Sequence, residues 1–270
     1  MPRLQRDPEG ERADRPYGAC YLFSDWSGIR RRLHAAKFVA LFTDFDGTVV
    51  PIQARSDRVH LSLAGRQLLA RLACHPRIRL WIVTGRRLAD IRRRTRGVGA
   101  HLAGLHGWER KHNVPQPGPA QETLRQVAGL LHSRLRGLHG VRIEDKKWAL
   151  SIHYRAAGKP EVRRARAVLR EVLKRFNPGL RLLPGKMVWE IIPCQIVSRG
   201  EAVRNLLAEA PQGALAVYIG DDSSDESAFR ALRQGITVHV GAGDSTRAQY
   251  YLRSPQEVLI FLGKIEREVT

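Results

Sequence analysis

The chain has 270 residues, of which 43% are hydrophobic and 27% are charged, and its formal net charge is +20. This length and composition allow a large core, arranged as one domain with an insertion or as two domains. No apolar run approaches the roughly 18 residues that span a bilayer, so we expect no membrane partner.

The first residues and the cysteines constrain the compartment. Residues 1–15 are charged and lack an apolar segment, which indicates a flexible tail rather than a secretory signal. Cys20, Cys74 and Cys194 have no paired spacing, so neither a disulfide framework nor a zinc site is expected. A reducing cytoplasm is the compartment that this cysteine usage predicts.

The basic charge raises the question of a nucleic-acid partner, because lysine and arginine surfaces neutralise phosphates. Arginines cluster at 30–32, 92–94 and 163–164, each within a segment of helical period. A solvated basic helix face explains such clusters, and no zinc-finger, aromatic RNP-type or helix-turn-helix pattern accompanies them. Nucleic acid is therefore not expected as a partner, and a positive field would also steer an anionic small substrate.

Short apolar runs that end in polar residues alternate with segments of helical period in both outer parts of the chain. Before residue 108 we expect helices over 24–36, 61–74 and 88–95 and strands over 38–43, 78–83 and 101–105. After residue 193 we expect helices over 200–209, 227–234 and 255–263 and strands over 214–219 and 236–240. This alternation predicts an α/β fold with a doubly wound, Rossmann-like parallel sheet.

The period changes in the middle of the chain. Helices are expected over 120–136 and 161–176, and strands over 141–145, 148–154, 180–183 and 187–192. Apolar and polar residues alternate in two of these strands, which is typical of a half-exposed sheet. We therefore predict a tail over 1–22, a core over 23–107 and 194–270, and an inserted α+β lid over 108–193. Its two short connections, near 107–115 and 191–199, predict a hinge that closes the lid over a ligand.

Polar residues follow four of the expected core strands directly, and the ends of such strands meet at one edge of a parallel sheet. These residues are Asp44 and Asp46, Thr84, His106, and the group Asp221, Asp222 and Asp225. Carboxylates from two strands can hold a hard cation through oxygen ligands, and a hydroxyl can donate to a phosphate oxygen. Any one of these strand-end groups alone could be a polar turn, but together they indicate a site for a divalent cation and a phosphate.

These motifs resemble those of the haloacid-dehalogenase-like phosphatases. The matching stretches are Asp44-Phe-Asp-Gly-Thr, Thr84-Gly-Arg and Gly220-Asp-Asp-x-x-Asp-Glu, with an α+β insertion like the cap of the sugar-phosphatase branch. Within that branch the chain is most similar to the trehalose-6-phosphate phosphatases, over about residues 37–262. Supporting stretches are Gly104-Leu-His-Gly, Glu144-Asp-Lys-Lys, Ser151-Ile-His-Tyr-Arg and Gly185-Lys-Met-Val-Trp-Glu-Ile-Ile-Pro.

The resemblance implies a role for each matching position of the core. Asp44 would be the nucleophile that becomes an aspartyl-phosphate, and Asp46 would protonate the leaving sugar oxygen and then help to activate water. Thr84 would bind the phosphate. Mg²⁺ would be held by Asp44, by the backbone carbonyl of Asp46 and by Asp221, with Asp222 or Asp225 in support.

The resemblance also implies which residues bind the sugar. Glu144, Lys146, Lys186 and Glu190 match the positions that contact glucose hydroxyls, while Arg155 and His153 are weaker candidates. His106 is either a substrate-binding residue or a histidine packed in its loop. One position departs from the family pattern, because Arg199-Gly200 stands where Lys-Gly is usual. Arginine keeps the charge and can bind phosphate through two hydrogen bonds, so Arg199 is expected to serve as the catalytic cation.

Two alternatives to a trehalose-6-phosphate phosphatase stay open at this point. One is a phosphatase of the same superfamily for another sugar phosphate, such as a glycosyl-phosphoglycerate or sucrose phosphate. The other, from a different class, is a basic nucleic-acid-binding protein that has kept the fold. We expect a Mg²⁺-dependent monomer whose partner is a small sugar phosphate.

Overall fold

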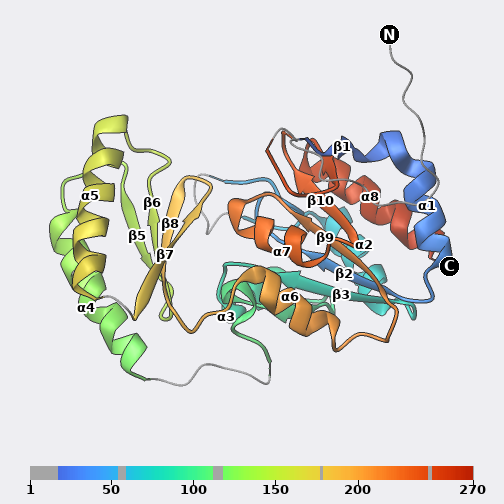
Figure 1. The fold of residues 1–270 in the computed structure, drawn as a ribbon, viewed down its shortest axis with the longest axis horizontal. Coiled ribbons are helices and arrows are strands. Elements are labelled where there is room, and N and C mark those ends of the chain that lie inside the picture. Colours follow the sequence, from blue (N-terminus) through green and yellow to red (C-terminus); the bar gives the residue numbers. More distant parts are fainter. Residues whose placement is uncertain (1–17, 54–58, 112–117, 177–178, 243–244, 270) are drawn as a thin grey trace, which may run out of the picture.

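The computed structural model describes residues 18–53, 59–111, 118–176, 179–242 and 245–269. These residues form a seven-stranded sheet and, beside it, a smaller four-stranded sheet with its own helices (Figure 1). The smaller sheet lies entirely between β4 (His101–Ala103) and α6 (Arg199–Leu207) of the chain, as the predicted insertion requires.

The larger sheet has the order β1-β11-β10-β9-β2-β3-β4, and all its strand pairs are parallel. Its strands are β1 (Cys20–Tyr21), β2 (Val39–Thr43), β3 (Ile78–Val83), β4 (His101–Ala103), β9 (Leu215–Gly220), β10 (Ile236–Val240) and β11 (Tyr250–Leu252). This parallel sheet, with helices on both faces and an α+β insertion, confirms the predicted fold class.

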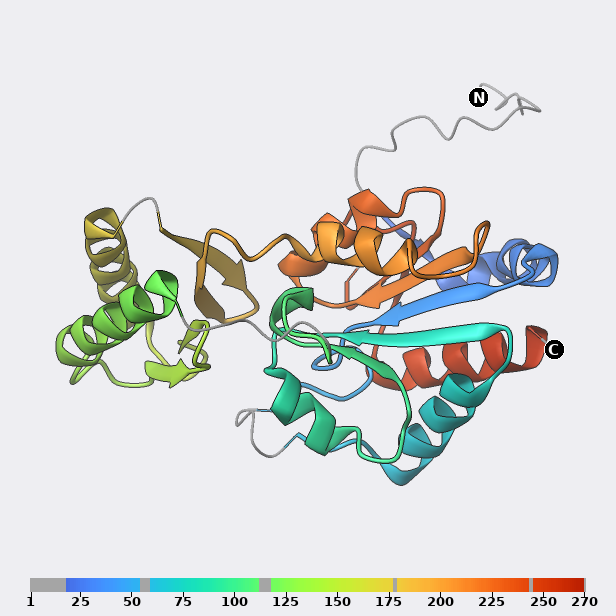
Figure 2. The ribbon, with the colours of Figure 1, turned by 90° about the horizontal axis from the view of Figure 1, so that it is seen from below.

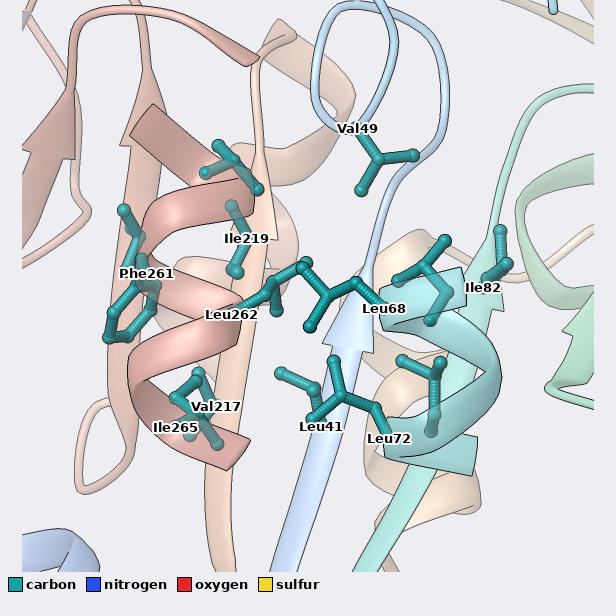
Figure 3. Close-up of a cluster of buried hydrophobic side chains, with 14 of the residues drawn as sticks. Leu41, Val49, Leu68, Leu72, Ile82, Val217, Ile219, Phe261, Leu262 and Ile265 are labelled. Atoms are coloured by element: carbon teal, nitrogen blue, oxygen red, sulfur yellow. The ribbon is translucent and has the colours of Figure 1, made fainter. Parts of the chain in front are cut away.

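One face of the large sheet is covered by α1 (Trp26–Ala35), α2 (Leu63–Cys74), α3 (Leu88–Arg94) and α8 (Pro255–Glu268). Leu41 on β2 and Ile219 on β9 point into this layer and meet Leu68 of α2 and Leu262 of α8 (Figure 3). Each such side chain, when fully buried, stabilises the fold by roughly 1.5–3 kcal/mol. This layer therefore fixes the strands whose ends carry the polar motifs.

The opposite face is covered by α6 (Arg199–Leu207) and α7 (Glu226–Ala231), as Figure 2 shows. Phe42 on β2 stacks on Trp81 of β3, with 4.7 Å between the ring centroids, and both belong to this second cluster. Successive residues of β2 thus enter opposite layers, and all five are buried. Burial on both faces explains why the expected core strands are continuous apolar runs rather than alternating ones.

The insertion has two layers, a sheet of order β5-β6-β8-β7 with antiparallel pairs and two helices on one face of it (Figures 1 and 2). Its elements are α4 (Pro119–Arg134), β5 (Arg142–Asp145), β6 (Leu150–His153), α5 (Lys159–Arg175), β7 (Leu180–Gly185) and β8 (Val188–Pro193). Leu150, Ile152 and Ile191 pack beneath the helices, so the sheet's other face turns toward the core.

That second face corrects one expectation. The alternation in β6 and β8 predicts a half-exposed sheet, yet Ser151 and Glu190, on the polar side, are 0% and 8% exposed. The polar residues are buried because this side of the sheet covers the ends of the core strands. Alternation in a sequence marks a polar face, but it does not tell whether water or another part of the chain lies against it.

The start of the chain also differs from the prediction. Most of the tail expected over 1–22 lies outside the described residues, but Cys20 and Tyr21 form β1, which pairs with β11, and Leu22 is fully buried. Neither β1 nor β11 was expected, because strands of two and three residues are too short to show a period of two.

In the part of the chain that the structure describes, no helix has the length and apolar character needed to cross a bilayer.

Candidate active site

A cleft of about 500 Å³ lies between the carboxyl ends of the core strands and the polar face of the insertion. All the predicted site residues line it except Asp225, which is fully buried beside it. The core supplies Asp44, Asp46, Thr84, His106, Arg199, Asp221 and Asp222, and the insertion supplies Glu144, Lys146, Arg155, Lys186 and Glu190.

The pairing of β2 with β9 brings the two acidic motifs together. The backbone N–H of Asp44 donates to the carbonyl of Ile219 at 2.9 Å, which places Asp44 close to Asp221. Gly47 has a φ of 81°, and a Cβ there would lie only 2.1 Å from Oδ2 of Asp221. Glycine at this position therefore lets the loop after β2 pass close to the carboxylate of the neighbouring strand.

Carboxylate oxygens of Asp44, Asp221 and Asp225 lie within 4.8 Å of one another, and all three residues are buried. Burial, reinforced by the neighbouring carboxylates, raises the pKa of Asp44 well above its usual value although Arg199 opposes the shift. Burial likewise raises the pKa of Asp221 to about 7. Among the described residues, Oδ1 of Asp44 is buried without a hydrogen-bond partner. Desolvated oxygens and an unpartnered oxygen fit a hard divalent cation.

Asp225 and Asp222, which were predicted to support the metal, have more hydrogen-bonded surroundings. Asp225 accepts hydrogen bonds from the Tyr218 hydroxyl at 2.6 Å and from the Asp222 N–H at 2.9 Å, and it pairs with Arg199. Asp222 caps a short 3₁₀ helix (Ser223–Asp225) by accepting the Ser223 N–H at 2.6 Å. Asp44 and Asp221 thus retain the most lone pairs for a cation.

Arg199 is the buried cation of this cluster. It stands at the first position of α6, which begins after Ser198, and is 4% exposed. Its Nη1 contacts Asp225 and lies 3.5 Å from Oδ2 of Asp44, while Nη2 donates to Nδ1 of His106 at 3.2 Å. Although burial opposes ionisation, Asp225 and Asp44 raise the pKa of Arg199 well above its usual value. The planar guanidinium group contacts three partners at once, which the single amine of a lysine does less well.

His106 links the core to the insertion. Because its Nδ1 accepts from Arg199, its Nε2 carries the proton and donates to Oε2 of Glu190 at 2.5 Å. The backbone of His106 has a φ of 60°, a left-handed conformation that is unusual outside glycine and is often found at functional sites. The 5% exposure of His106 agrees with packing as well as with a contact to substrate.

Glu190 is the centre of the insertion's hydrogen-bond network. Its Oε1 accepts from Nζ of Lys146 at 2.5 Å and from Oγ of Ser151 at 2.9 Å. Burial alone would raise the pKa of Glu190, but Lys146 and His106 lower it well below its usual value. Lys146 also donates to the Gly85 carbonyl of the core at 3.0 Å, so this network joins both walls of the cleft.

The remaining residues of the insertion lie nearer to solvent. Glu144 accepts from His153 at 2.7 Å, and this bond is the main cause of a lowered pKa of Glu144. Nζ of Lys186 lies 3.4 Å from Oδ2 of Asp221, with half of its side chain exposed. Arg155 is exposed and donates to the Lys186 carbonyl at 3.3 Å. Lys186 thus reaches the core, whereas Arg155 stays at the edge.

One residue of the site, Arg86, was not predicted from the sequence. Arg86, in the loop after β3, donates to both carboxylate oxygens of Asp46, at 2.5 and 2.7 Å. Its backbone N–H donates to Oγ1 of Thr84 at 3.2 Å. Arg86 directly follows the Thr84-Gly85 motif, which was the available signal, but a partner 40 residues away is set by the pairing of β2 with β3.

The fold and these strand-end motifs define a phosphatase of the haloacid-dehalogenase-like type. A haloacid dehalogenase-like hydrolase from Bacteroides thetaiotaomicron has the same fold, with a TM-score of 0.59 at 18% identity, over 86% of this chain and 99% of that one. The family model described as "Trehalose-phosphatase" matches residues 42–256. The chain belongs to the trehalose-phosphatase family and is a phosphoric monoester hydrolase, which confirms the predicted family and class of enzyme.

Relatives agree with this assignment. The chain is 32% identical over 251 residues to "Probable trehalose-phosphate phosphatase D" of Arabidopsis thaliana, an alignment that covers 85% of this chain and 67% of the plant protein. The C-terminal domain of a C. albicans trehalose-6-phosphate phosphatase superposes with a TM-score of 0.80, covering 93% of this chain and 98% of that domain at 22% identity. At that identity the likeness shows the fold alone.

Proposed function

We propose that the chain is a Mg²⁺-dependent phosphatase that hydrolyses trehalose 6-phosphate to trehalose and phosphate. The observation that carries this proposal is a single cleft whose core wall holds Asp44, Thr84 and Arg199, and whose opposite wall holds Lys146 and Glu190. The first set suits a phosphate ester and the second suits sugar hydroxyls. A cleft of about 500 Å³ lies within the usual range for small-molecule sites, roughly 300–1,000 Å³.

Asp44 is assigned as the nucleophile. Its buried carboxylate attacks phosphorus, the bond from phosphorus to the sugar oxygen breaks, and Asp46 gives a proton to that oxygen. Asp46 then takes a proton from a water molecule, which attacks the aspartyl-phosphate and releases Asp44 and phosphate. Arg199, with its Nη1 3.5 Å from Asp44, offsets the negative charge that the phosphoryl group brings to this buried oxygen.

The divalent cation would be held by Asp44 and Asp221, with the Asp46 carbonyl as a third ligand. When bound, it neutralises phosphate charge and orients the phosphoryl group. Asp225 would support the site by fixing Arg199 and the loop after β9, because its oxygens already accept three hydrogen bonds or ion pairs.

The insertion, which we assign to 108–193 and call the cap, would select the sugar. Glu190 already accepts from Lys146, Ser151 and His106, and a carboxylate has about four acceptor sites, so it has room for one sugar hydroxyl. Lys146 would donate to a neighbouring hydroxyl. Glu144 and Lys186, also in the cleft, would contact the rest of the disaccharide, while Arg155 is too exposed to contribute as much.

The decisive experiment is phosphate release from a panel of sugar phosphates that includes trehalose 6-phosphate, sucrose phosphate and a glycosyl-phosphoglycerate. We expect release that requires Mg²⁺, is fastest for trehalose 6-phosphate and is lost in Asp44→Asn. Preference for another member of the panel would reassign the substrate. If no member releases phosphate while the protein retains RNA or DNA in a salt-sensitive manner, even as Asp44→Asn, the nucleic-acid alternative would replace the enzyme.

The cap would close over the substrate by a hinge at its two connections to the core, 107–115 and 191–199, of which residues 112–115 lie outside the described residues. Three cap-to-core contacts, of Glu190 with His106, Lys146 with Gly85 and Lys186 with Asp221, suit a closed arrangement that opens when they part. Small-angle scattering with and without a phosphate mimic tests this, and identical profiles would count against it. Action as a monomer in the cytoplasm stays a prediction.

A further inference from the structure

Arg86 makes contacts that the proposed reaction does not yet use. Its side chain is 10% exposed, and its guanidinium holds both oxygens of Asp46 through Nε and Nη2, at 2.5 and 2.7 Å. Two parallel hydrogen bonds from a planar fork fix both the position and the plane of a carboxylate. A carboxylate that has to transfer protons at a defined atom depends on that orientation.

The guanidinium of Arg86 is itself held in place by a second carboxylate, that of Asp90. Nη1 of Arg86 donates to Asp90 at 2.6 Å, and Asp90 also accepts from Arg94 at 2.9 Å. The guanidinium lies over the Phe45 ring, 5.9 Å from its centroid, and the Arg86 backbone N–H donates to Thr84. The loops after β2 and β3 are therefore joined through one side chain, which can direct Asp46 only where these supports place it.

We infer that Arg86 is the positioning residue of the proton-transferring carboxylate Asp46, and that it acts mainly on the hydrolysis of the aspartyl-phosphate. This inference rests on the proposed function. When the bond from phosphorus to the sugar oxygen breaks, that oxygen receives the proton of Asp46, and a carboxylate anion appears beside the guanidinium. The two hydrogen bonds from Arg86 hold this carboxylate in one position and one plane, from which it accepts a proton of the water molecule that attacks phosphorus.

The two chemical steps place different demands on Asp46, and this separates positioning from a general structural role. A sugar is a poor leaving group and needs the proton, whereas p-nitrophenolate leaves without one. Formation of the aspartyl-phosphate from p-nitrophenyl phosphate should therefore be independent of Arg86, while its hydrolysis should depend on Arg86 for every substrate.

The experiment compares the wild-type enzyme with Arg86→Gln and Arg86→Lys in the presence of Mg²⁺. With enzyme in excess over p-nitrophenyl phosphate, we expect the first-turnover rate of nitrophenolate release to stay within about three-fold of wild type. Steady-state turnover should fall by about 10- to 100-fold, part of the 10²- to 10⁴-fold that general acid–base catalysis supplies. Acid quenching with ³²P-labelled substrate should show more phosphoenzyme in both variants, because its hydrolysis is slowed.

Arg93→Gln is the matched control, since Arg93 also donates to Asp90, at 3.0 Å, but is 80% exposed and does not touch Asp46. Both of its rates should equal those of wild type. Arg86→Lys keeps the charge without the fork, so full turnover in this variant would overturn positioning by two hydrogen bonds. A first-turnover rate that falls together with steady-state turnover in both variants would show that Arg86 only holds the site together. Absence of turnover in the wild-type enzyme would instead refute the proposed function.

Discussion

Buried carboxyl groups on the two walls of the cleft have pKa values shifted in opposite directions. On the core wall Asp44, Asp221 and Asp225 lie together with the buried cation Arg199, and the pKa values of Asp44 and Asp221 are raised. On the cap wall Glu190 has Lys146 and His106 around it, and its pKa is lowered. Equal burial thus gives opposite shifts, because neighbouring charge decides which protonation state is favoured.

This contrast indicates what each wall requires. The cluster of Asp44, Asp221 and Asp225 has more carboxylates than Arg199 alone can balance, so a divalent cation would complete it. On the cap wall Glu190 is already partnered, by Lys146 and Ser151 of the cap and by His106 of the core. The donors and acceptors of this wall are therefore oriented before a sugar arrives and lose little entropy on binding.

The largest effect is expected from the core wall. Asp44→Asn removes the proposed nucleophile and a proposed cation ligand together, and we expect turnover of any phosphate ester to fall by at least about 10³-fold. Phosphate release in the presence of Mg²⁺ measures this. Because the substitution also removes a buried, desolvated carboxylate, thermal stability without metal should not fall; a large loss of stability would contradict the view that this wall is electrostatically incomplete.

Glu190→Gln tests the cap wall. It leaves the Lys146 amine buried without its charged partner, and breaking one side of such a pair costs about 3–5 kcal/mol when no water reaches it. We therefore expect a lower melting temperature together with a raised KM for trehalose 6-phosphate. Glu144→Gln is the control, since its carboxylate is about one third exposed, and it should raise KM with little change in stability.

Arg199→Lys separates charge from shape at the junction of the two walls. Lysine preserves the charge beside Asp44 but lacks a counterpart of Nη2, which in the wild-type protein donates to Nδ1 of His106 at 3.2 Å. We expect kcat to fall by about 10-fold with KM nearly unchanged, because one charge-assisted contact of about 1.5 kcal/mol is lost on the catalytic side. A change confined to KM would show that the fork serves the cap and the sugar rather than the phosphoryl group.

The smallest expected effect is a pH-dependent response to Mg²⁺. Asp221 has a pKa of about 7 in the folded protein and near 3.8 when unfolded, so the folded state binds more protons between these values. Metal-free stability should therefore decrease as the pH rises from about 4 to 7. Mg²⁺ competes with that proton, so the rise in melting temperature on adding Mg²⁺ should be larger at pH 8 than at pH 5.5. Asp221→Asn should remove this difference, and an equal response at both pH values would argue against Asp221 as a ligand.

Much of the core could be predicted from sequence because its signals are local. A continuous apolar strand that ends at Asp44 implies burial on both faces, and parallel strands carry Thr84 and Asp221 to the same edge. The sequence determined the α/β fold class, the insertion and the polar residues that line one cleft. It could not reveal β1 and β11, because β11 is held by pairing with β10 and β1 by pairing with β11, rather than by a pattern of their own.

The tertiary structure decided which of these residues interact and how they are charged. The contact of Arg86 with Asp46 and the contact of Glu190 with His106 join residues 40 and 84 positions apart. Whether the polar face of the cap sheet meets water or the core is equally invisible to local alternation. Burial and neighbouring charge set the pKa of each carboxylate, and both depend on how the two walls of the cleft come together in space.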